Sequence, residues 1–234
     1  MNLVYIHGNH ATADSFNFIR SRLPGHHDIL LEYDSSHGFY TNHAAMLDRL
    51  DGLDDVFFVA HSLGGIHALH LAHELGARVI GGVTMSTPYG GSEAAEMVAC
   101  LLPFSQVLKD IRPRSAPIIA GRGMELTVPW TNLVSTSGSS PFMLAANDGV
   151  VTLGSMRQRS DIRLVDIDCN HFEIVLNEKA IAVIEGEIGA ALRGERAAAC
   201  AARPFRTCGG SAASCLPAAR SATGRRFASA PAPA

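Results

Sequence analysis

Six short apolar segments recur along the chain, and a helical pattern separates most of them from the next. In chain order they are Asn2–His7, Asp28–Glu32, Val56–Ala60, Val79–Met85, Thr131–Ser135 and Arg163–Ile167. Most are continuous apolar runs without alternating polar residues, which is typical of parallel strands covered on both faces. Strands that alternate with helices predict an α/β fold, with a compact, mainly parallel six-stranded sheet between two layers of helices.

Caps and breakers predict four helices around these strands. They span Ser15–Leu23, Asn42–Leu50, Leu63–Leu75 and a last helix from Asn177 to about Arg193. We expect Asp14 and Thr41 to be the N-caps of the first two helices, Asn177 to cap the last, and Gly76 to end the third. A further amphipathic stretch, Ser92–Asp110, is either a helix that rests over a site or an ordinary crossover helix.

The charge of the chain is unevenly distributed. The net charge is −3, but residues 194–234 carry six arginines and one glutamate, so residues 1–193 carry −8. The last 41 residues also hold three of the five cysteines and few large apolar residues, which predicts a disordered basic tail. We therefore expect one catalytic domain over 1–193 and a tail over 194–234. The acidic domain is not expected to bind nucleic acid, whereas the tail could bind it weakly and without sequence preference.

No segment of the sequence predicts insertion into a membrane or export. No run approaches 18 consecutive apolar residues, the length that a spanning helix requires. The first residues, MNLVYIHG, lack the basic and long apolar regions of a signal peptide. The expectation is a soluble, cytoplasmic protein whose oligomeric state the sequence does not reveal.

The motif most informative about chemistry is Ala60-His61-Ser62-Leu63-Gly64-Gly65, between a predicted strand and a predicted helix. It is a variant of the nucleophile elbow G-x-S-x-G, with Ala60 as the first small residue. A sharp turn there lifts the Ser62 hydroxyl out of the sheet, and small residues two before and two after avoid a clash across the turn. The alternative is that Ser62 is an ordinary helix-capping serine.

A nucleophilic serine requires a base and an acid that orients the base. His171 is the candidate base, because it follows the last predicted strand in the loop where open α/β sheets bind ligands. Asp148 is the favoured acid, and Asp166 and Asp168 are competitors close to His171. The alternative for Asp148 is a turn-forming Asp-Gly pair.

These residues resemble the small, lidless bacterial lipases and carboxylesterases of the α/β-hydrolase family. The similarity covers about residues 1–192, and its motifs are the elbow, His7-Gly8, Ser15-Phe16-Asn17-Phe18, Met85–Gly91, Asp148 and His171. The resemblance implies the compact hydrolase sheet without the first two strands of the full fold. It also implies an oxyanion hole formed by the backbone N–H groups of Leu63 and Asn9, with His10 as the alternative to Asn9.

The resulting expectation is a serine hydrolase that cleaves a small-molecule carboxylic ester without a cofactor. Rival activities of the same triad are those of a thioesterase, lactonase, amidase or acyltransferase, and a non-catalytic binding module is the rival from another class. Side chains that could line the substrate pocket are His10, His61, Met85, Tyr89, Phe104, Trp130 and Phe142. No metal site is expected. His67, His70 and His73 recur at helical spacing without an acidic or cysteine partner, so we interpret them as solvated helix histidines.

Overall fold

Six strands form one sheet in the computed structural model, which describes residues 1–98, 102, 104–141 and 143–194. In chain order they are β1 (Asn2–Ile6), β2 (His27–Leu31), β3 (Val56–His61), β4 (Val79–Met85), β5 (Trp130–Ser135) and β6 (Arg163–Ile167). All neighbours are parallel, in the order β2-β1-β3-β4-β5-β6. Each strand begins and ends within one residue of its predicted range, so the predicted fold class is confirmed.

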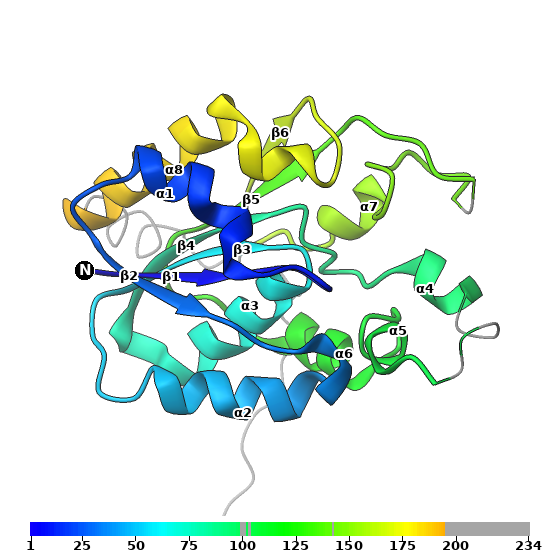
Figure 1. The fold of residues 1–234 in the computed structure, drawn as a ribbon, viewed down its shortest axis with the longest axis horizontal. Helices are drawn as coiled ribbons and strands as arrows, with labels where there is room; N and C mark the ends of the chain where they lie inside the picture. Colours follow the sequence, from blue (N-terminus) through cyan, green and yellow to red (C-terminus); the bar gives the residue numbers. More distant parts are fainter. Residues whose placement is uncertain (99–101, 103, 142, 195–234) are drawn as a thin grey trace, which may run out of the picture. The chain divides into compact units, whose positions relative to one another are not determined.

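Helices cover both faces of this sheet (Figure 1). One face carries α1 (Asn17–Arg22) and α8 (Glu178–Leu192), and the other carries α2 (Phe39–Arg49), α3 (Leu63–Leu75) and α6 (Ala116–Gly123). The short helices α4 (Glu93–Val98), α5 (Gln106–Asp110) and α7 (Leu153–Met156) lie toward the carboxyl ends of the strands. Four 3-10 turns complete the described elements: η1 (Ala13–Phe16), η2 (Ser35–His37), η3 (Gly76–Arg78) and η4 (Glu173–Leu176). Within the described ranges, no helix is both long and apolar enough to cross a membrane.

The continuous apolar runs fill a separate core on each face of the sheet. Successive strand residues point to opposite faces, so Leu3 and Tyr5 of β1 pack with α1 and α8. Val4 and Ile6 pack with residues of α2 and α3 instead. Burial on both faces is the physical reason that these strands lack polar alternation.

Two helices begin at residues that their local sequence did not predict. Asn177 caps α8 as expected, since its side chain accepts hydrogen bonds from the next turn. Thr41 is not a cap, because α2 begins at Phe39, whose N–H donates to Asp110 across the chain at 2.8 Å. Asp14 is not a cap either: η1 begins at Ala13, whose N–H donates to Glu32 at 2.7 Å. Carboxylates from distant segments supply both acceptors.

The stretch Ser92–Asp110 forms two helices, α4 and α5, where one amphipathic element was considered. Residues 99–101 and 103 between them lie outside the described part of the chain, as does 195–234, the bulk of the predicted tail. Ser105 caps α5 by accepting from the Leu108 N–H at 3.4 Å. The sequence patterns did not predict α6 or α7.

Two of the three helix histidines are buried, so the expectation that they are solvated is wrong for this pair. His67 is fully buried and His70 is 2% exposed, whereas His73 is exposed. The His67 ring stacks on Phe39 with centroids 4.1 Å apart, and neither of its ring nitrogens has a hydrogen-bond partner. Burial, with the nearby imidazoles of His43, His70 and His7, lowers the pKa of His67 well below its usual value. The ring must therefore stay neutral in the folded state.

Replacing His67 with phenylalanine is expected to reduce the loss of stability in acid. In the unfolded chain this histidine takes up a proton below about pH 6.5, whereas the folded chain resists it, so stability falls as pH falls below that value. Phenylalanine keeps a planar ring on Phe39 and binds no proton. The measurement is the midpoint of urea unfolding at pH 8 and pH 5, with exposed His73→Gln as the matched control. An equal acid loss in parent and His67→Phe would contradict this account.

Candidate active site

A strained turn carries Ser62 out of the sheet between β3 and α3. Its backbone has φ 53° and ψ −122°, a conformation that residues with a side chain rarely adopt. The Ser62 N–H donates to the Met85 carbonyl of β4 at 2.8 Å, which fixes the turn to the neighbouring strand. The hydroxyl therefore projects beyond the carboxyl edge of the sheet, at the N-terminus of α3.

The two glycines after Ser62 allow α3 to lie unusually close to its neighbours. A Cβ at Gly64 would overlap the backbone carbonyls of Ile6 and His7 at the end of β1. A Cβ at Gly65 would overlap the side chain of Thr87, just after β4. The small residues of the elbow thus correspond to real close contacts with the strands on either side of β3.

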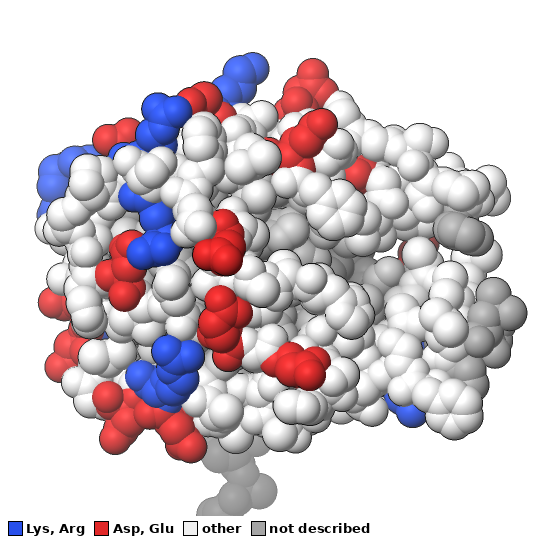
Figure 2. All heavy atoms as spheres, in the orientation of Figure 1, with Lys and Arg blue, Asp and Glu red and all other residues white. Residues whose placement is uncertain are grey.

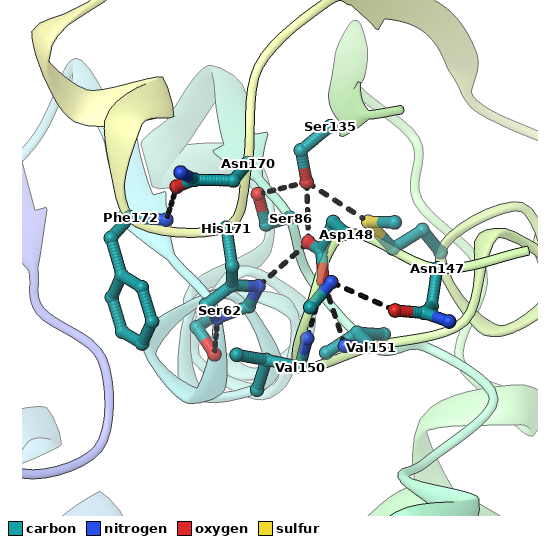
Figure 3. Close-up of polar contacts among 12 residues, drawn as sticks. Ser62, Ser86, Ser135, Asn147, Asp148, Val150, Val151, Asn170, His171 and Phe172 are labelled. Atoms are coloured by element: carbon teal, nitrogen blue, oxygen red, sulfur yellow. Dashed lines mark hydrogen bonds and ion pairs between the residues drawn. The ribbon is translucent and has the colours of Figure 1, made fainter. Parts of the chain in front are cut away.

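Ser62, His171 and Asp148 form a continuous line of hydrogen bonds (Figure 3). Nε2 of His171 is 3.0 Å from Oγ of Ser62, and Nδ1 of His171 is 2.7 Å from Oδ2 of Asp148. The three side chains come from the turn after β3, the loop after β6 and the loop after β5. Because a carboxylate only accepts, Nδ1 of His171 carries the proton and Nε2 is left to accept from the serine.

Asp148 is a buried carboxylate whose acceptor positions are all engaged. Oδ1 accepts from the N–H groups of Val150 at 3.0 Å and Val151 at 2.7 Å. Oδ2 accepts from Ser135 at 2.5 Å as well as from His171. Burial favours the neutral acid, but the hydrogen bonds from these partners and the charge of His171 outweigh it and lower the pKa of Asp148. The group is held as an anion.

The two competing carboxylates point elsewhere. Asp166 lies in β6, where its carboxylate pairs with the guanidinium of Arg157 at 2.7 Å. Asp168 accepts a hydrogen bond from the Ser137 hydroxyl. Of the three candidate acids, the structure brings only Asp148 to the ring of His171.

His61, the residue before Ser62, holds the backbone of the loop that carries His171. Its Nε2 is 2.9 Å from the His171 carbonyl oxygen, and the two ring centroids are 5.0 Å apart. Burial lowers the pKa of His61 to about 3, so the ring is neutral and its Nε2–H donates to that carbonyl. The His171 N–H donates in turn to the Asp148 carbonyl at 3.1 Å. Both backbone polar groups of His171, its N–H and its carbonyl, are therefore held by hydrogen bonds.

A cavity of about 340 Å³ opens beside the Ser62 hydroxyl and the His171 ring. Its lining residues are Gly8, Asn9, Ala11, Ser15, His61, Ser62, Val150, His171, Phe172 and Val175. None of them is an acid, a lysine or an arginine. On the face in Figure 2, few charged side chains lie toward the carboxyl ends of the strands, and most gather over the opposite side. The surroundings of the cavity suit an uncharged ligand.

The fold and this geometry agree with a family-level similarity. A family model described as the alpha/beta hydrolase family matches residues 3–171, most of the chain. The chain belongs to the alpha/beta hydrolase family. That membership supports hydrolase activity. No curated protein matches the sequence.

Solved structures of other alpha/beta hydrolases share the fold at low sequence identity. A metagenomic carboxyl esterase is 18% identical, with a TM-score of 0.66 over 83% of this chain and 76% of that one. The mature lipase of Bacillus licheniformis is 15% identical, with a TM-score of 0.61 over 81% and 91%. A tomato methylketone synthase I variant complexed with β-ketoheptanoate is 11% identical, with a TM-score of 0.54 over 81% and 98%. At these identities the likeness shows the fold alone.

Four residues expected in the pocket of this alpha/beta hydrolase do not line it. Tyr89 is buried, and its hydroxyl lies 2.9 Å from Thr84 Oγ1 and from the indole nitrogen of Trp130. Trp130 starts β5, so it lies at the amino edge of the sheet, opposite the site. Phe104 is 93% exposed. His10 is exposed at a turn where its φ is 53°.

Two further expected pocket residues are accounted for differently. Met85 is fully buried in the core of the α1–α8 face, and Phe142 lies outside the described residues. Of the expected residues, His61 is among those that line the cavity, together with Asn9, one of the two oxyanion candidates. The other, Leu63, begins α3, so its N–H has no carbonyl partner within the helix. Among the described residues, no group of three histidine, cysteine or acidic side chains is placed to hold a metal ion.

The apolar wall of the cavity was not predicted from the sequence. Phe172 packs edge-on against the His171 ring, with centroids 5.3 Å apart, and Val175 follows one turn later. Val150 comes from the loop of Asp148. All three lie within four residues of a triad candidate, so proximity along the chain to Asp148 and His171 is the signal that could have found them.

Changing His61 to phenylalanine is expected to lower kcat about tenfold with little change in KM. The carbonyl of His171 would lose its donor in a buried setting, and the ring of His171 would be held less firmly, at a cost of about 1–2 kcal/mol. Steady-state kinetics at pH 8 measure the effect. His61→Gln, which keeps an N–H donor of similar reach, is the control and should recover most of the activity. Equal losses in both variants would contradict the role given to this hydrogen bond.

Proposed function

We propose that this chain is a serine hydrolase that cleaves carboxylic esters through Ser62, His171 and Asp148. The observation that carries the proposal is the hydrogen-bonded line from Asp148 through His171 to Ser62, with the serine on a strained turn beside a cavity. A serine that only capped a helix would need neither a strained backbone nor a partnered imidazole.

In the proposed reaction, Ser62 Oγ attacks the acyl carbon while His171 Nε2 takes its proton. Asp148 holds the ring in the tautomer that leaves Nε2 free and stabilises the imidazolium. His171 then protonates the leaving alcohol, and a water activated by the same nitrogen hydrolyses the acyl-enzyme. The N–H groups of Leu63 and Asn9 are proposed to donate to the oxyanion. No cofactor takes part in any step.

The cavity supports a small, uncharged ester as the substrate. Its volume of about 340 Å³ lies at the small end of ligand sites. Val150, Phe172 and Val175 offer an apolar wall, and no side chain of the lining carries a fixed charge that would bind a phosphate or a carboxylate. We expect short to medium acyl chains to be preferred over long ones.

The test combines a fluorophosphonate probe with a substrate panel. The probe should label Ser62, identified by mass spectrometry of the modified peptide, and p-nitrophenyl esters of increasing acyl length should be hydrolysed with a maximum at short to medium length. Activity should fall at acid pH, because the proposed mechanism requires a neutral imidazole as its base. Preferred turnover of thioesters, lactones or amides would replace the ester assignment. Absence of labelling and of turnover would favour a binding module.

A further inference from the structure

Two buried serines, Ser135 and Ser86, lie near the carboxylate of Asp148, and Ser135 is on the side of that carboxylate away from Ser62 (Figure 3). Ser135 is the last residue of β5 and Ser86 the first after β4, and both are fully buried. Ser135 Oγ is 2.5 Å from Oδ2 of Asp148 and 2.7 Å from Ser86 Oγ. Neither serine lines the cavity, so neither contacts a substrate bound there.

The direction of these hydrogen bonds follows from the number of protons. The Ser135 hydroxyl has one proton, and three acceptors lie within reach: Asp148, Ser86 and the sulfur of Met156 at 3.6 Å. The carboxylate is the strongest acceptor of the three, so Ser135 donates to Asp148. The proton between the two serines must then come from Ser86. The bonds run one way, from Ser86 to Ser135 to Asp148.

Ser135 and His171 donate to the same oxygen. Oδ2 accepts from Ser135 at 2.5 Å and from His171 Nδ1 at 2.7 Å, while Oδ1 is occupied by two backbone N–H groups. Hydrogen bonds that share one acceptor draw on the same negative charge, and each weakens the other. The serine pair therefore reduces the charge that Oδ2 presents to the His171 ring.

The backbone of Ser86 is held in an unusual conformation that places its hydroxyl. Its φ is 51°, a region that favours glycine, and its N–H donates to the Leu133 carbonyl at 2.8 Å. A residue with a side chain in this region costs folding free energy that other contacts must offset. The hydroxyl of Ser86 forms a hydrogen bond with Ser135. This interaction explains a serine at a position where glycine would be less strained.

We propose that Ser86 and Ser135 are positioning residues that orient Asp148 and moderate the basicity of His171 through a one-way pair of hydrogen bonds. This inference rests on the proposed serine-hydrolase function. It assigns the two serines a measurable effect on the pH profile, separate from contact with the substrate.

Two further titratable groups near the triad, His61 and Cys169, stay neutral over the range of the test. Burial lowers the pKa of His61 to about 3 and, with the carboxylates of Glu173, Asp148 and Asp168, raises the pKa of Cys169 to about 11. Both groups are therefore neutral between pH 5 and pH 9. Asp168 is bonded to Ser137, so a variant at Ser137 measures how far that carboxylate affects the profile.

The experiment compares the acid limb of kcat/KM between the parent, Ser135→Ala, Ser86→Gly and the double variant. Without the Ser135 hydroxyl, Oδ2 of Asp148 accepts a hydrogen bond from His171 alone, so the carboxylate stabilises the imidazolium better. The midpoint of the acid limb should therefore move upward by roughly half to one pH unit. Ser86→Gly suits the positive φ and should move the midpoint the same way by less. Because Ser86 acts through Ser135, the double variant should match Ser135→Ala. Ser137→Ala, which removes a nearby hydroxyl that bonds Asp168, should match the parent.

Proton NMR of the His171 Nδ1–H provides a readout independent of turnover, and thermal unfolding establishes that each variant is folded. Unchanged acid limbs and unchanged Nδ1–H titration in Ser135→Ala would overturn the inference, as would a downward shift or additive shifts in the double variant. A parent that the fluorophosphonate probe labels at Ser62 keeps the proposed function even if these shifts are absent. A parent that neither reacts nor turns over ester overturns both.

Discussion

Alanine in place of Ser62 is expected to reduce turnover of p-nitrophenyl esters by at least about four orders of magnitude. The variant keeps the His171–Asp148 pair and the cavity but has no atom to attack the acyl carbon. Binding is expected to persist, because the removed hydroxyl is a small part of the cavity lining. The loss should therefore appear in kcat and not in KM.

The control for this prediction is the thermal stability of the variants, which shows that they are folded. Ser62→Ala leaves the φ of 53° in place, so its thermal midpoint should remain close to that of the parent. Ser62→Gly, equally inactive, should unfold at a higher temperature, because glycine relieves backbone strain of about 1–3 kcal/mol at such a position. Substantial turnover in either variant would remove Ser62 from the mechanism.

Replacing Asp148 with asparagine is expected to lower kcat by about 10³–10⁴-fold. The carboxylate now accepts from Val150, Val151, Ser135 and His171, whereas an amide nitrogen can only donate. In either orientation of the amide, its NH2 group replaces one carboxylate oxygen and then faces hydrogen-bond donors, from which it cannot accept. If the nitrogen faces His171, the ring is driven toward the tautomer that leaves a proton on Nε2, and the base is lost. Steady-state kinetics with a folded variant measure the effect.

Matched controls are provided by the two acids that also lie near His171 in the sequence. Asp168→Asn and Asp166→Asn remove the same charge from side chains bonded to Ser137 and Arg157 instead. Both should retain activity within about twofold, since both carboxylates are exposed and solvent screens their charges. A loss at either position as large as that of Asp148→Asn would redirect the assignment of the acid.

Strands β1, β3 and β4 were predictable because each is buried along nearly its whole length, and burial on both faces requires a continuous apolar run. Val79–Met85 and Arg163–Ile167 were bounded to the residue. Helix starts were less predictable: Phe39 and Ala13 begin their helices with N–H groups bonded to Asp110 and Glu32, and no local pattern reports an acceptor that comes from elsewhere in the chain. The four residues of α7 are too few to show a helical period.

In the candidate site, too, the features set by local sequence were predictable, and those set by contacts between distant segments were not. The elbow and the position of His171 are local features that a strand-to-helix turn and a strand end make recognisable. The sequence favoured Asp148 over Asp166 and Asp168, but only packing decides which of these side chains faces the ring of His171. The expected aromatic lining was wrong at Trp130, which begins β5 and so lies at the amino edge of the sheet. Its place directly before the predicted strand Thr131–Ser135 already indicated that edge.

Refolding of this all-parallel sheet depends on contacts between distant parts of the chain. Parallel neighbouring strands cannot be joined by tight hairpins. Ser62 and His171 are separated by 109 positions, so bringing them together requires closing long loops of the chain. Chains dominated by such distant pairings renature slowly. During refolding, reactivity toward a fluorophosphonate should therefore recover later than the native tryptophan fluorescence and the helical circular dichroism signal. The probe then reports the rate of the last step of assembly.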